Sequence, residues 1–94
     1  MKIEIKKFGT TLTSRQDGKE AFNAYLSNLK NLEKDEKVEV DFEGVITFTP
    51  SWGDEFLTNL ANEVGKDNLV FKNTENPSVK ATLDLLEKIS QSKV

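Results

Sequence analysis

The chain has 94 residues, with 13 lysines and arginines against 16 acidic residues, a net charge of −3, and neither cysteine nor histidine. We interpret residues 1–94 as a single domain with one modest core. The missing residue types exclude disulfides, thiolate or imidazole catalysis and ordinary zinc sites, so we expect a non-enzyme with no catalytic residue, metal or cofactor. The acidic balance argues against nucleic-acid binding. With no apolar run of membrane-spanning length and no signal-peptide pattern, we expect a cytoplasmic protein without membrane contact.

The first half of the chain predicts a strand, a helix and a second strand. Apolar and charged residues alternate over 2–8, with a one-residue slip at Lys7, which is the period of a β-strand. A short extended piece at 12–13 precedes a helix, for which Ser14 and Asp17 are N-cap candidates. The apolar face of this helix consists of Phe22, Tyr25, Leu26, Leu29 and Leu32. The second strand follows, with Val38, Val40 and Phe42 on its apolar side.

The second half predicts a helix, a strand and a last helix after a partly apolar loop at 45–48. The helix covers 52–64, and Gly65 fits the left-handed position that ends it. A brief strand follows at 69–71. Asn76 caps the last helix, Pro77 takes its first position, and its inward stripe consists of Val79, Leu83, Leu86 and Ile89.

This order is β-α-β-α-β-α, in an α/β domain. Strands buried on both faces of a parallel sheet read as continuous apolar runs, whereas the first two strands here split into an apolar and a charged side. We therefore expect the helices mainly on one face of the sheet and water on the other. Right-handed crossovers between neighbouring strands produce that layout, a short β-α superhelix.

Three short motifs resemble the STAS-like domains, relatives of bacterial anti-sigma-factor antagonists. The pair Ser14-Arg15 is similar to the family's opening, and residues 40–45 (Val-Asp-Phe-Glu-Gly-Val) resemble its central strand. Residues 51–56 (Ser-Trp-Gly-Asp-Glu-Phe) look like its helix-opening Ser-Phe-x-Asp-Glu motif. Trp52 replaces the usual phenylalanine, and Thr49 stands where the better-known antagonists place an aspartate.

The resemblance implies the same β-α superhelix and a non-catalytic protein-interaction module in a bacterial regulatory switch. It makes Ser51 the phosphoacceptor candidate of a partner kinase. The implied protein partner is a histidine-kinase-like ATPase domain or an anti-sigma factor, bound by a monomer. We expect docking through the loop and helix start between Phe48 and Glu55, with these partner-binding candidates: Phe48, Thr49, Pro50, Trp52, Asp54 and Glu55.

The residues themselves leave plainer roles open at the helix start. Ser51 is also an N-cap candidate, with Asp54 three residues on as the second half of a capping box. Asp54 and Glu55 complement the positive end of the helix. Trp52 is either buried against Phe48 or partly exposed as an interface residue, and the loop at 46–48 has the same two interpretations.

Two further polar candidates are Arg15 and Asp41. Arg15 either clamps a carboxylate or phosphate or pairs locally with Asp17 or Glu20. Asp41, at the carboxyl end of the second strand, is predicted to bind a loop amide or a lysine of the first strand.

The alternative function is a small-ligand or nucleotide-binding domain at the carboxyl edge of the sheet. Its anion site would consist of Asp41, Ser51 and the start of the second helix. The sequence lacks a glycine-rich phosphate loop, which counts against this alternative.

Overall fold

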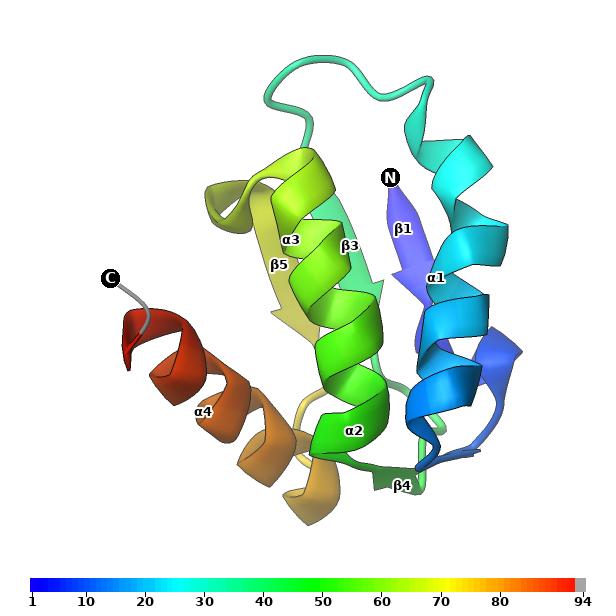
Figure 1. Cartoon of the computed structure of the whole chain (residues 1–94), viewed down its shortest axis with the longest axis vertical. Helices are drawn as coiled ribbons and strands as arrows, with labels where there is room; N and C mark the ends of the chain where they lie inside the picture. The colour runs from blue at the N-terminus through cyan, green and yellow to red at the C-terminus, as the bar shows by residue number, and fades with distance from the viewer. Residues whose placement is uncertain (93–94) are drawn as a thin grey trace.

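The computed structural model describes residues 1–92, with side chains through position 89 (Figure 1). It confirms an α/β domain built on parallel strands. In chain order the elements are β1 (Lys2–Glu4), the 3₁₀ turn η1 (Ile5–Phe8), β2 (Thr11–Leu12), α1 (Arg15–Leu29), β3 (Val38–Asp41), β4 (Thr47–Phe48), α2 (Pro50–Gly53), the π-helical segment η2 (Asp54–Thr58), α3 (Asn59–Val64), the 3₁₀ turn η3 (Lys66–Asn68), β5 (Leu69–Lys72) and α4 (Pro77–Ser92).

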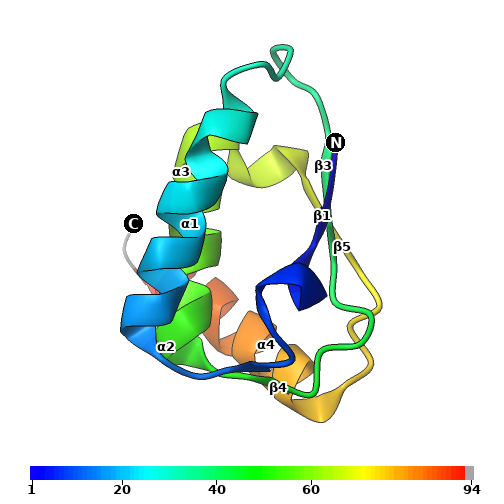
Figure 2. The same cartoon turned by 90° about the vertical axis from the view of Figure 1, so that its right-hand side faces the viewer.

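Two parallel sheets organise these elements. The larger has the order β1-β3-β5, with Ile3 opposite Val40 and Val40 opposite Phe71. The smaller pairs β2 with β4, with Leu12 opposite Phe48. Figure 2 shows the helices along one face of the larger sheet and the other face uncovered, which is the predicted layout.

The core lies between the larger sheet and the helices. Val38 and Val40 of β3 are fully buried on the covered side. Their neighbours Glu39 and Asp41 point to the other face, because successive strand residues alternate sides. The split of β3 into an apolar and a charged side therefore positions the helices.

The predicted element order is incomplete at two places. The first strand ends at Glu4, not at Phe8, because the chain turns through η1 and this turn brings both Ile5 and Phe8 toward the core. Gly9, with φ of 137°, follows the turn. The predicted loop at 45–48 contains β4, which forms a second sheet with β2. Strands of two residues leave too short an alternation to recognise in a sequence.

Helix ends were predicted with mixed success. Gly65 ends α3 with φ of 91°, and the Asn76 side chain caps α4 by accepting from the backbone N–H groups of Ser78 and Val79. However, α1 ends at Leu29 and not at residue 32. Ile89 is 39% exposed, so the predicted stripe of α4 is not buried along its full length.

Candidate functional site

The start of α2 is held directly against the start of α1. Thr49 is the N-cap residue of α2, and Pro50 occupies the first helical position, where its missing N–H costs nothing. The Thr49 hydroxyl donates to the carbonyl oxygens of Leu12 (3.2 Å) and Thr13 (3.1 Å), and its N–H donates to Leu12 at 3.0 Å. These bonds fix the beginning of α2 to the segment that leads into α1.

The predicted cap at Ser51 is wrong. With Ser51 as the cap the helix would begin at Trp52, but it begins two residues earlier, at Pro50. Ser51 is therefore the second residue of α2, and the capping box with Asp54 does not form. The cap at the start of α1 is Ser14, whose hydroxyl accepts from the Asp17 N–H at 3.2 Å. Ser51 is half-buried, and capping of α2 does not account for a serine at this position.

The aromatic residues around Ser51 lie inside the protein. Trp52 and Phe48 are each 1% exposed, and their ring centroids are 5.8 Å apart. Trp52 also stacks on Phe56 with centroids 5.0 Å apart and an interplanar angle of 19°. Neither Trp52 nor Phe48 presents its side chain to a partner, which corrects their assignment as contact residues. The bulkier ring at position 52 fills the core beneath the helix start.

Helices α1 and α2 touch through their backbones next to this aromatic cluster. A methyl group placed at Gly18 would lie 2.6 Å from the Trp52 carbonyl oxygen and 3.0 Å from its Cα. Only glycine allows so close an approach. The two helix starts are therefore fixed relative to each other by packing as well as by the Thr49 bonds.

Arg15 crosses from α1 to the acidic residues of the second helix. Its Nη1 donates to Asp54 Oδ2 at 3.1 Å and to Glu55 Oε1 at 2.9 Å. Both hydrogen bonds raise the pKa of the guanidinium, and the bond to Glu55 has the larger effect. The local pairing predicted with Asp17 or Glu20 is wrong, because the carboxylates that Arg15 contacts belong to the second helix of the same chain.

The second helix widens where these two carboxylates begin. Residues Asp54–Thr58 form a π-helical segment, a local expansion that often occurs at functional sites. Side chains one turn further on bind back to it: the Thr58 hydroxyl donates to Asp54 Oδ1 at 2.9 Å, and the Asn59 amide donates to the Glu55 carbonyl oxygen at 2.6 Å. The Asp54 carboxylate is thus held by both Arg15 and Thr58, whereas Asn59 binds only the backbone of Glu55.

Asp41 has the structural role predicted for it. Its Oδ1 accepts from the Asn73 amide at 2.7 Å and from the Glu43 N–H at 2.9 Å, and its Oδ2 lies 3.4 Å from Lys2 Nζ. These contacts hold the pKa of this carboxyl below its ordinary value, and the hydrogen bond from Asn73 has the largest effect. Asp41 therefore ties together the three strands of the larger sheet.

The anion site proposed for the carboxyl edge is not assembled. Asp41 lies on the charged face of β3, whereas Ser51 lies on a helix that covers the other face. Asp41 is also 4% exposed and already bonded to three groups. Within residues 1–92 no cluster of three or more acidic side chains is arranged to hold a metal ion.

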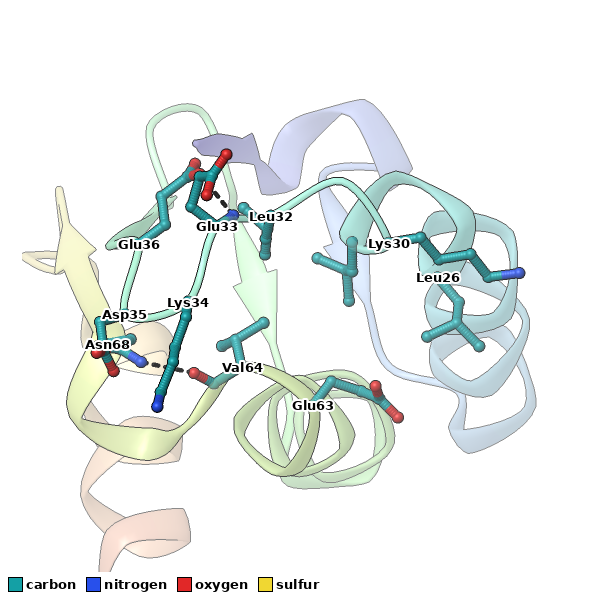
Figure 3. A pocket seen from close by; sticks show the side chains of 11 residues that line it. Leu26, Lys30, Leu32, Glu33, Lys34, Asp35, Glu36, Glu63, Val64 and Asn68 are labelled. Atoms are coloured by element: carbon teal, nitrogen blue, oxygen red, sulfur yellow. Dashed lines mark hydrogen bonds between the residues drawn. The ribbon is translucent and has the colours of Figure 1, made fainter.

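A hollow of about 430 Å³ lies at the opposite, amino end of the sheet (Figure 3). Its floor is apolar and its rim is charged, and no motif in the sequence pointed to it. The loop over residues 30–37 covers one side and the end of α3 the other. The lining residues are Leu26, Leu29, Lys30, Leu32, Glu33, Lys34, Asp35, Glu36, Glu63, Val64 and Asn68.

A protein family described as a STAS-like domain of unknown function (DUF4325) matches residues 25–79, more than half of the chain. The chain belongs to this family. No curated protein and no solved structure matches the chain. The matched part of this STAS-like domain contains Ser51, Asp54 and Glu55, whereas Arg15 precedes it. The contacts of Arg15 thus join a residue outside the matched part to two residues within it.

The described helices of this STAS-like domain, in residues 1–92, include none with the length and apolar character needed to cross a membrane. The sequence missed two features of the site. Thr49 followed by Pro50 is itself a helix-start signal, since threonine is a favoured N-cap residue and proline a favoured first residue, but the cap was predicted at Ser51. The partner choice of Arg15 depends on how α1 packs on the second helix, and the sequence hints at that packing through a glycine inside the first helix, Gly18.

Proposed function

We propose that this STAS-like domain is a non-catalytic, cytoplasmic protein-interaction module of a bacterial regulatory switch. It docks as a monomer through the surface at the start of α2, which we call the docking surface: Ile46, Thr49, Pro50, Ser51, Asp54 and Glu55. The implied partner is a histidine-kinase-like ATPase domain or an anti-sigma factor, as in the relatives that the motifs resemble.

The observation that supports this proposal is an exposed apolar group on a rigid base. Ile46 is 65% exposed, more than the other large apolar side chains described. Its own N–H donates to the Thr10 carbonyl at 2.8 Å, and its carbonyl oxygen accepts from Asn76 at 2.9 Å. Exposed apolar groups on preorganised backbone are typical of binding surfaces, since little conformational entropy is lost on docking.

Phosphorylation of Ser51 by the partner kinase would regulate the docking surface. The Ser51 oxygen forms the new bond to the γ-phosphorus of ATP, the bond to the bridging oxygen breaks, ADP leaves, and the hydroxyl proton passes to a base of the kinase. The dianion would lie beside Asp54 and Glu55, and so add charge to an interface that is already acidic. We therefore expect phosphorylation to weaken docking.

Binding of the purified partner by calorimetry tests the docking surface. We expect Ile46→Asp to weaken binding at least about tenfold, because a charge would replace an exposed apolar contact. The matched control is Leu85→Asp on α4, which changes another exposed apolar side chain, 42% exposed, outside the docking surface as defined. Equal affinities for the two variants would refute this location.

The phosphorylation step has its own comparison. We expect Ser51→Asp to bind the partner more weakly than Ser51→Ala. Equal affinities of the two variants would show that Ser51 is not the switch, and would not contradict the proposed docking surface.

Small-ligand binding remains a second proposal, and the hollow at the amino end is the observation that favours it. Its volume lies in the range of small-molecule sites, about 300–1,000 Å³. A thermal-shift screen with nucleotides and small anions tests it, because a bound ligand raises the melting temperature. If a ligand raises the melting temperature of the wild type but not of Leu32→Lys, its binding site is the hollow. If no compound in the screen changes the melting temperature, the result counts against this function.

A further inference from the structure

The two carboxylates that Arg15 binds follow Ser51 by about one helical turn. Ser51 precedes Asp54 by three residues and Glu55 by four, and residues at these spacings share a helix face. The Asp54 N–H bonds to the Pro50 carbonyl oxygen, so the turn that contains Ser51 is regular. Arg15 binds both carboxylates of that face, at 3.1 and 2.9 Å.

The present partners of Arg15 do not bind it as a rigid pair would. A single nitrogen, Nη1, serves both carboxylates, so the planar fork of the guanidinium is not matched to either one. The side chain is 55% exposed, and water screens such surface pairs. The contacts are therefore weak enough to exchange for a better acceptor.

A phosphate on Ser51 would be that better acceptor. It carries close to two negative charges at neutral pH and three strong acceptor oxygens, and it suits bidentate binding by arginine. It would also repel the two carboxylates one turn away. Packing of Gly18 on Trp52 fixes the start of α1 against α2, so Arg15 is a cation positioned to offset this repulsion.

We propose that Arg15 reads the phosphorylation state of Ser51, by moving from Asp54 and Glu55 to the phosphate. This inference rests on the proposed modification of Ser51. In the unmodified protein Arg15 covers the two carboxylates of the docking surface, and in the modified protein it leaves them exposed next to the phosphate. The loss of docking then comes from a rearranged set of charges as well as from the added group.

The test uses full-length protein with phosphoserine incorporated at position 51 during translation, so no kinase is needed. The second pKa of the phosphate is measured by ³¹P NMR. We expect Arg15→Gln to raise this pKa by at least about 0.5, because a cation in contact with the phosphate favours its dianion. Lys30→Gln, which removes a charge at the far end of α1, is the matched control and should leave it unchanged.

Equal pKa values in Arg15→Gln and Lys30→Gln would overturn the inference. A second measurement is the ¹⁵N chemical shift of the Arg15 guanidinium. We expect it to differ between phosphorylated and unmodified protein, and an unchanged shift would mean that Arg15 stays on its carboxylates. Because Arg15 is exposed, both variants should keep the wild-type circular dichroism. The proposed phosphorylation switch fails separately, if Ser51→Asp and Ser51→Ala bind the partner equally well.

Discussion

The carboxyl end of the sheet and its amino end are held together by different kinds of contact. At the carboxyl end, Trp52 and Phe48 are buried and Gly18 allows two helix backbones to touch. At the amino end, a loop at 30–37 covers a hollow, and its connections are exposed polar bonds such as that of the Met1 amino group to Glu36 at 3.1 Å. The end with buried rings and touching helix backbones is the one that carries Ser51, Asp54 and Glu55.

The largest effect that would separate the two ends is truncation of Trp52. We expect Trp52→Ala to cost about 3–5 kcal/mol of unfolding free energy, because it empties a site between three other aromatic rings. Leu32→Ala, at the half-buried amino end, should cost about 1 kcal/mol. Urea unfolding followed by circular dichroism measures both. Similar losses would mean that the two ends do not differ in packing.

The sign of the stability change on substituting Gly18 tests the contact between the two helix backbones. Within a helix, alanine is ordinarily more stable than glycine by about 0.5–1 kcal/mol. Here the added methyl would meet the Trp52 carbonyl at 2.6 Å, so we expect Gly18→Ala to be destabilised by about 1–3 kcal/mol. Asn28→Ala, exposed near the end of the same helix, is the control and should be neutral or stabilising. A stabilised Gly18→Ala would show that the helices can separate without cost.

The smallest effect concerns acid and the open face of the sheet. The pKa of Asp41 lies below its ordinary value of 3.8, so its contribution to stability is fully present above that pH. This contribution is lost as pH falls through the lower, folded value. We expect Asp41→Asn to lose less stability than wild type between pH 5 and the lower pKa, as measured by urea titrations at each pH. Parallel curves would assign the acid sensitivity to other carboxyls.

The features that could be predicted from the sequence are those that depend on residues close together in the chain. The sided pattern of β3 and the Asn76-Pro77 start of α4 depend on neighbouring residues only, and both were correct. The two-residue strands, the partners of the Thr49 hydroxyl and the partners of Arg15 depend on contacts between segments more than 30 residues apart. A pattern within one segment carries no information on such contacts.

The burial of Trp52 has a practical consequence, since it is the chain's one tryptophan. It follows Ser51 directly, and its indole is shielded from water by Phe8, Phe48 and Phe56. Its fluorescence should therefore be emitted at short wavelength and resist soluble quenchers. The protein thus carries an optical reporter beneath its own candidate switch, with which docking or phosphorylation can be followed without any label.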